Sequence, residues 1–241
     1  MNIEEVVKDY RSGITNHDSD HSWDQCYLYF NGMPTNPSVD IRDQAALRLA
    51  FYLASWGMYR GSSFLPKYNY TIHNACIDLL LQPKFELLRQ PGFDLELGSS
   101  HSGLIMELVT AIRESYRPFA PESEERQASD TLVTKIILGT YACLPACDRY
   151  FIRGFKRDGY TYSYAGEPFV ERILGIRAKN EELLLKLQTL FLTETGMRYP
   201  AMKLLDMYFW QLGYDEESRE AAIAKGSLTD DLKAIHRDKT I

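Results

Sequence analysis

The stretch TLVTKIILGTYACLPACDRYFIRGF, residues 131–155, decides the fold. Residues 132–141 are mostly apolar with helical spacing, Pro145 interrupts the pattern, and Asp148 stands where a following helix begins. Lys135 lies inside the first helix, so one lysine and one aspartate flank a sharp break, and both are candidate catalytic residues. Aspartate is also a favoured N-cap, because its oxygen accepts backbone N–H groups at a helix start. A purely structural role for Asp148 is therefore the alternative interpretation, and it is compatible with a catalytic one.

The rest of the chain also reads mainly as helix. Apolar residues recur at helical spacing between capping residues, glycines and prolines. The expected helices cover residues 3–10, 22–30, 42–56, 74–81, 103–117, 181–195 and 201–212, and a terminal helix begins at Ser227. The alternating stretch GYTYSYAG, residues 159–166, is short and favours a loop or a small hairpin. The sequence therefore predicts an all-α helical bundle.

Length and composition are typical of a globular protein. The chain has 241 residues, of which 45% are hydrophobic and 25% are charged, enough for one compact domain or for two lobes with a groove between them. If there are two lobes, the boundary is expected near residues 118–130. No stretch has the length of a membrane span, and the N-terminus lacks a secretory signal pattern. We expect no membrane partner, a cytoplasmic location, and reduced cysteines that are too scattered for a zinc site.

A local basic cluster stands out against the formal net charge of −6. Residues 149–157 contain no acidic residue. They carry Arg149, Arg153 and Lys156 at helical spacing, directly after Asp148. Because phosphate contacts from lysine and arginine supply most of the affinity for nucleic acid, this cluster favours DNA as a partner held close to Asp148. A solvated helix face is the alternative.

A second candidate site is LASWGMYRGSSFL, residues 53–65. The backbone N–H groups near its two glycines, the serine hydroxyls and the Arg60 guanidinium can converge on a phosphate or a base. The aromatic rings of Trp56 and Tyr59 can stack on an extruded base. The candidate substrate-binding residues are Trp56, Tyr59, Arg60 and Ser62, together with Trp23 and Asp24 from an earlier segment. A glycine C-cap followed by an N-cap serine is the alternative reading.

A third candidate site is NHDSDHSWD, residues 16–24. His17 and His21 are four residues apart, as are Asp20 and Asp24, so a helix here would stack two pairs of metal ligands. A bound metal would indicate a nuclease or another hydrolase. A polar turn with capping aspartates explains the same residues, and no third ligand follows at a recognisable distance.

The apolar segment MKLLDMYFWQLGY, residues 202–214, carries one acid, Asp206. An acid within an apolar helix needs a partner, so a structural salt bridge is the favoured interpretation, with an arginine such as Arg153 or Arg60 among the possible partners. Trp210 in the same segment is expected to be core packing.

The order lysine, apolar helix, proline-containing turn, aspartate, helix resembles the core of the helix-hairpin-helix DNA glycosylase superfamily and its glycosylase-like bacterial relatives. The resemblance covers about 25 residues. It implies a helical fold with the active site between two lobes. It also implies that Asp148 stabilises the sugar cation and helps water attack, and that Lys135 attacks the sugar carbon in members that cut the strand. The residues before Lys135, ESEERQASDTLVT, lack the Gly-hydrophobic-Gly hairpin of that superfamily.

The sequence supports two main functional hypotheses of different classes and a third, less favoured one. The first is a DNA glycosylase-like enzyme that extrudes a modified or damaged base, in foreign (phage) DNA among others, and hydrolyses its N-glycosidic bond. The second is a non-catalytic helical module that binds DNA or a protein, with Lys135 and Asp148 as ion pair and cap. The metal-dependent nuclease is a third. The chain has no P-loop, GxGxxG or GxSxG pattern, so we expect no cofactor.

Overall fold

The computed structural model describes residues 2–14, 20–61, 63–89, 101–119 and 128–224. The predicted terminal helix at Ser227 and the candidate residues His17 and Ser62 lie outside these ranges. No helix in the described ranges combines the length and hydropathy that are needed to cross a membrane.

The described residues form eleven α-helices and no strand, so the predicted all-α class is confirmed. The helices are α1 (Ile3–Ser12), α2 (Asp20–Gly32), α3 (Val39–Ser55), α4 (Asn74–Leu80), α5 (Glu86–Arg89), α6 (Ser102–Ser115), α7 (Asp130–Thr140), α8 (Arg149–Arg157), α9 (Glu167–Lys179), α10 (Glu181–Thr195) and α11 (Ala201–Ala224). Residues 159–166 contain no strand and form a loop between α8 and α9. Short 3₁₀ helices lie at Leu65–Lys67, Tyr70–His73, Pro83–Phe85 and Arg117–Phe119.

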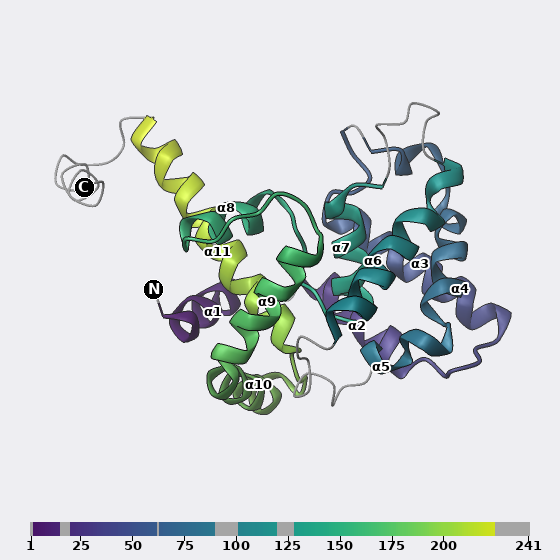
Figure 1. The fold of residues 1–241 in the computed structure, drawn as a ribbon, viewed down its shortest axis with the longest axis horizontal. Helices are drawn as coiled ribbons and strands as arrows, with labels where there is room; N and C mark the ends of the chain where they lie inside the picture. Colours follow the sequence, from purple (N-terminus) through teal and green to yellow (C-terminus); the bar gives the residue numbers. More distant parts are fainter. Residues whose placement is uncertain (1, 15–19, 62, 90–100, 120–127, 225–241) are drawn as a thin grey trace.

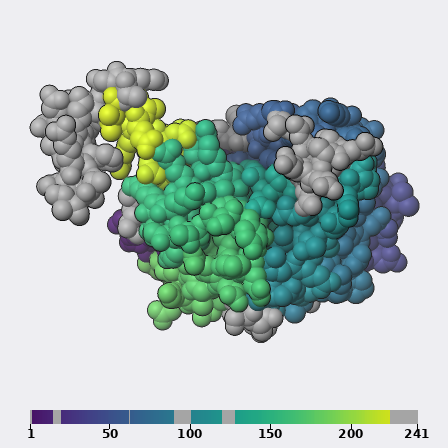
Figure 2. All heavy atoms as spheres, turned by 45° about the horizontal axis from the view of Figure 1, so that its top comes forward, coloured from purple at the N-terminus to yellow at the C-terminus, as the bar shows by residue number. Residues whose placement is uncertain are grey.

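Two groups of helices lie side by side (Figure 1). One contains α2 to α7, in which α3 and α7 pack on α2, and α6 packs on α4 and α7. The other contains α8 to α11 together with α1, and α11 packs on α1, α8, α9 and α10. Contacts between α6 and α9 join the groups, and the space-filling view shows one continuous body from which the C-terminal part of α11 projects (Figure 2). The chain passes between the groups twice, once between α1 and α2 and once in the turn between α7 and α8.

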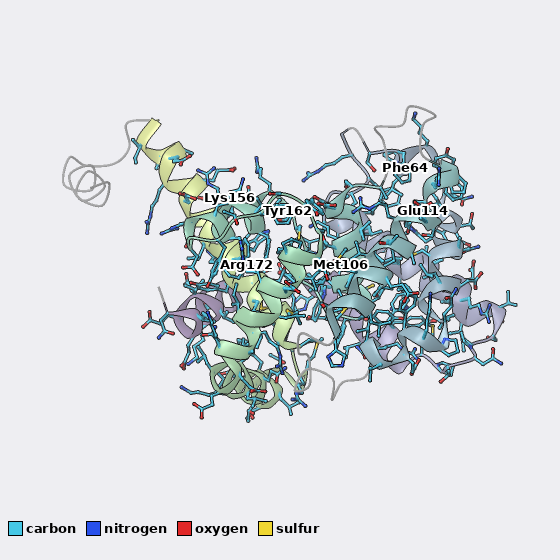
Figure 3. The ribbon with its side chains drawn as sticks, in the orientation of Figure 1. Phe64, Met106, Glu114, Lys156, Tyr162 and Arg172 are labelled. Carbon is cyan, nitrogen blue, oxygen red and sulfur yellow. The ribbon has the colours of Figure 1, made fainter. Side chains whose placement is uncertain are left out.

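Asp130, in the first turn of α7, fastens the loop 159–166 to α6. Its carboxylate accepts hydrogen bonds from the Tyr162 hydroxyl at 2.8 Å and from the backbone N–H of Ala165 at 2.7 Å, and it pairs with Arg113 at 2.7 Å. Tyr162 is labelled near the junction of the two groups in Figure 3. One carboxylate thus ties three segments together beside the turn that carries Asp148.

Helices α8 and α11 cross at unusually close range, because glycines face each other there. A Cβ atom added at Gly154 would overlap the backbone oxygen of Phe209, and one added at Gly213 would overlap that of Tyr150. Glycine lets the two backbones touch where any side chain would hold them apart. This contact fixes the position of α11 against the start of α8, and therefore against Asp148.

His73 lies at the centre of a buried hydrogen-bond chain in the first group of helices. Its Nε2 is 2.8 Å from the Tyr59 hydroxyl and its Nδ1 is 2.6 Å from the Tyr116 hydroxyl. The imidazole is fully buried, and burial lowers the pKa of His73 to about 4. The neutral ring can satisfy both neighbours by donating from one nitrogen and accepting at the other.

This depressed pKa gives a stability prediction. Between pH 6.5 and pH 4 the unfolded chain binds a proton at His73 and the folded chain does not, so stability falls as the pH falls through that window. The loss due to this group is up to about 3 kcal/mol. Urea unfolding at a series of pH values should show that wild type loses this much more stability than His73→Gln, which carries no titrating ring. Parallel curves for the two proteins would contradict the assignment.

Candidate functional site

The predicted break between two helices and the predicted N-cap of the second helix are both present. Helix α7 ends at Thr140 and α8 begins at Arg149, with Asp148 as its N-cap. Asp148 Oδ1 accepts the backbone N–H groups of Tyr150 at 3.1 Å and Phe151 at 3.0 Å. The capping interpretation of Asp148 is therefore confirmed, and it leaves the second carboxylate oxygen, Oδ2, for another partner.

Lys135 supplies that partner. Its Nζ lies 3.1 Å from Asp148 Oδ2, and the side chains of Lys135 and Asp148 are 5% and 15% exposed. The lysine reaches across from the middle of α7, so the ion pair bridges the break between the two helices. Separating the two side chains would leave a buried charge without a partner, which costs free energy. The ion pair therefore holds both side chains in place.

The turn that carries Asp148 is held by three further hydrogen bonds. Thr134 Oγ1 accepts the backbone N–H of Cys147 at 2.8 Å, and the Thr131 hydroxyl donates to the carbonyl of Cys147 at 2.9 Å. Asp206 Oδ1, from α11, accepts the backbone N–H of Ala146 at 2.9 Å. The position of Asp148 is thus set by residues from both groups of helices.

Asp206 belongs to a second lysine–aspartate pair beside the first. Its Oδ2 lies 3.2 Å from Lys203 Nζ, and both side chains are almost completely buried. Burial raises the pKa of Asp206, and the neighbouring Asp148 adds to the rise, while Lys203 and the Ala146 N–H oppose it. The expected structural salt bridge is present, but the partner is Lys203 and not an arginine: Arg153 instead pairs with glutamates further along α11.

A small hollow lies between the two pairs. It is lined by Tyr52, Trp56, Lys135, Leu138, Ala146, Asp148, Lys203, Asp206 and Trp210. These residues come from α3 and α7 in one group and from the α7–α8 turn and α11 in the other. The hollow has room for about one water molecule. Two carboxylates, two ammonium groups and three aromatic side chains therefore surround a site for one small polar group.

Aromatic rings lie against both ammonium groups. Lys135 Nζ lies 5.0 Å from the ring centroid of Trp56, and Lys203 Nζ lies 5.0 Å from Trp23 and 5.7 Å from Trp56. Trp23 is fixed by its indole N–H, which donates to the carbonyl of Leu138 at 2.8 Å. Cation–π contacts of this kind compensate in part for the desolvation of a buried ammonium group.

The predicted substrate-binding residues divide between the hollow and other places. Trp56 lines the hollow, and Trp23 lies directly behind it. Tyr59 instead binds His73, and the exposed Arg60 lies against Gly57. Asp24 accepts hydrogen bonds from Tyr199 and His21 and does not line the hollow.

The predicted basic cluster is largely neutralised. Arg149 pairs with Glu217 at 3.1 Å, and Arg153 pairs with Glu216 at 3.1 Å and with Glu220. All three glutamates lie on α11, which packs along α8. Lys156 is exposed on α8 and is labelled in Figure 3. The surface beside Asp148 is therefore a mixed-charge one.

The candidate metal ligands have other partners. Asp20 accepts a hydrogen bond from the Tyr10 hydroxyl, and His21 lies 3.1 Å from Asp24. Within the described ranges, which exclude His17, no three histidine, cysteine or acidic residues are grouped so that they could hold a metal ion. All four cysteines lie in the described ranges, are buried and form no disulfide.

Sequence reasoning missed the contribution of α11 to the site. Lys203 is not among the residues predicted for the site, and Trp210, expected to be core packing, lines the hollow with it. A signal was present: Lys203 and Asp206 are three residues apart, which places them on one face of an otherwise apolar helix. Two opposite charges on one face of an apolar helix indicate a buried ion pair.

Comparison of the chain with protein-family models, with curated proteins and with solved structures found no match.

Proposed function

We propose that the protein removes a modified or damaged base from DNA by hydrolysis of the N-glycosidic bond, with foreign (phage) DNA among its substrates. The observation that supports this most is the position of Asp148. Its carboxylate sits at the start of α8, pairs with Lys135 at 3.1 Å, and borders a hollow that has room for one water molecule. A fixed carboxylate next to a water site is what hydrolysis through an oxocarbenium-like sugar cation requires.

Each part of the site has a role in this reaction. The Asp148 carboxylate stabilises the positive charge that develops on the sugar as the base departs, and it orients the water that attacks C1′. Lys135 holds the carboxylate in place. Trp56 and Trp210 provide flat faces on which an extruded base can stack. Because the hollow has room for only about one water molecule, entry of a base requires these aromatic side chains to move.

The proposal is tested with a panel of duplexes and phage genomes that carry different base modifications, incubated with the protein and then treated with alkali to cut at abasic sites. Base release from at least one substrate is the expected result. Lys135→Ala, assayed with and without alkali, tests whether the amine also cuts the strand: cutting without alkali should be lost, and base release should fall as well because Asp148 loses its ion-pair partner. No abasic product on any substrate would contradict the proposal.

The glutamates of α11 give a prediction about DNA affinity. In the triple variant Glu216→Gln, Glu217→Gln, Glu220→Gln, three acidic side chains are neutral and Arg149 and Arg153 are free to contact phosphates. We expect DNA binding to tighten about tenfold at low salt and the gain to shrink as salt is added. Fluorescence anisotropy with a labelled duplex measures both.

The matched control carries the same three changes of charge at Glu5, Glu171 and Glu182, which are exposed and lie on α1, α9 and α10. If the gain came from net charge alone, both triple variants would bind equally well. Equal binding would therefore contradict a specific role for the paired arginines.

A non-catalytic helical module that binds DNA or a protein is the second candidate. The observation that favours it is that Lys135 and Lys203 each already pair with an aspartate, around a hollow with little free space. On this reading both pairs only fix the packing of α7, α8 and α11. Retained DNA binding without base release on any member of the panel would support it.

A further inference from the structure

The entrance to the hollow lies among those of its side chains that reach the surface. Most of the residues that line the hollow are buried, whereas Trp56, Asp148 and Trp210 are partly exposed. These three come from the end of α3, from the start of α8 and from α11. The other lining side chains are covered by further parts of the protein, so a ligand reaches the hollow past one of these three.

Asp148 and Trp210 are both held on several sides. Asp148 accepts two backbone N–H groups of α8 and pairs with the ammonium group from α7. The ring of Trp210 makes edge contacts with Tyr10, at 5.6 Å between ring centroids, and with Tyr150, at 5.0 Å. It also stacks on Tyr214 at 5.1 Å. Aromatic pairs contribute stability beyond the area that they bury, so displacement of Trp210 breaks several favourable contacts at once.

Trp56 is held less firmly than the other two tryptophans. Among the described residues its ring has no aromatic partner, and its indole N–H is buried without an acceptor. The ring lies against the ammonium groups of Lys135 at 5.0 Å and Lys203 at 5.7 Å. Trp23, in contrast, donates its N–H to a backbone carbonyl and stacks on two tyrosine rings. Of the side chains at the entrance, Trp56 therefore has the fewest contacts to lose.

The observed position of the Trp56 ring is favoured and opposed by effects of similar size. The two cation–π contacts favour it. The N–H without an acceptor opposes it, because water would accept from this group if the ring turned outward. Since the ring is already partly exposed, turning it outward costs less apolar burial than moving a buried side chain. A second, outward position is therefore close in free energy to the observed one.

We propose that Trp56 is the gate of the hollow: its indole turns outward in the free protein, and a planar ligand ring enters the space that it leaves. Such a ring faces the same two ammonium groups as the indole did, so its binding shifts the population towards the open position. The inference deepens the proposed function and rests on it only for the identity of the ligand. The motion of the ring is a property of the protein alone.

Fluorine NMR of the full-length protein labelled with fluorotryptophan measures this motion directly. The chain has three tryptophans, so three resonances are expected, and single tryptophan-to-phenylalanine replacements assign them. We expect relaxation dispersion on the microsecond-to-millisecond timescale at Trp56, with an open population of about 1–10%. Trp23 and Trp210 should show none. Absence of dispersion at Trp56, or dispersion of equal size at Trp210, would overturn the inference.

The double variant Lys203→Met, Asp206→Asn tests what holds the gate closed. It removes one ammonium group from the Trp56 ring together with the paired carboxylate, and asparagine can still accept the backbone N–H of the α7–α8 turn. We expect the open population to rise about threefold. Lys84→Met is the matched control, because it removes a cation–π contact that does not line the hollow, and it should leave the Trp56 resonance unchanged. An unchanged population in the double variant would contradict the role of the ammonium group. If the double variant does not fold, the dispersion in wild type still decides.

The base-release assay separates this inference from the proposed function. Base release by a protein whose Trp56 resonance shows no dispersion would overturn the gate and leave the glycosylase proposal standing. Dispersion confined to Trp56, with no base released from any substrate of the panel, would overturn the glycosylase proposal and leave the gate standing.

Discussion

The Asp148→Asn variant is expected to lose base release by at least about 10²- to 10³-fold, which in an abasic-site assay means no detectable product. The reason is electrostatic. Asp148 is the carboxylate at the start of α8 that borders the hollow, and a neutral amide cannot stabilise the positive sugar in the transition state. The measurement is single-turnover base release on the best substrate of the panel.

The variant is informative because it preserves the cap. Asparagine is as good an N-cap as aspartate, so the amide oxygen can still accept the N–H groups of Tyr150 and Phe151. The ammonium group of Lys135 loses its partner, so thermal unfolding of the same sample is needed to show that the protein is folded. Asp78→Asn, the same change on the surface of α4, should keep both activity and stability. Full activity in a folded Asp148→Asn protein would remove Asp148 from the proposed role.

The Gly154→Ala variant is expected to have the largest effect on stability. Its added methyl group would overlap the backbone oxygen of Phe209, and a backbone atom cannot rotate away as a side chain can. Helices α8 and α11 must then separate along the contact that positions Asp206 and Trp210 against Asp148. We expect a loss of at least about 3 kcal/mol and a fall in the midpoint of thermal unfolding of about 10 °C.

Gly175→Ala on α9 is the matched control. A Cβ atom there meets no atom within 4 Å, so the same change should stabilise the helix by up to about 1 kcal/mol. Differential scanning calorimetry of both variants distinguishes a steric effect from a general effect of alanine. A Gly154→Ala protein with the stability of wild type would show that α8 and α11 do not need their close approach.

Local signals predicted the part of the site that is local in sequence. Pro145 marks the break, and Asp148 caps the next helix through N–H groups two and three residues away. The remaining geometry depends on tertiary contacts. The partners of Arg153 are at least 63 residues away, and the Trp23–Leu138 hydrogen bond spans 115 residues. Spacing along one helix can show that charges share a face, but it cannot show which distant element covers that face.

The positions of the aromatic residues have an optical consequence. The chain has three tryptophans, and all of them meet at the hollow: Trp56 and Trp210 line it, and Trp23 lies against Lys203. The tryptophan fluorescence of the whole protein therefore arises from this one place. Any ligand that parts Trp56 from the ammonium groups of Lys135 and Lys203 changes the field on its ring, so the wavelength and intensity of emission will shift without any added label. The protein thus carries its own reporter of what enters the site.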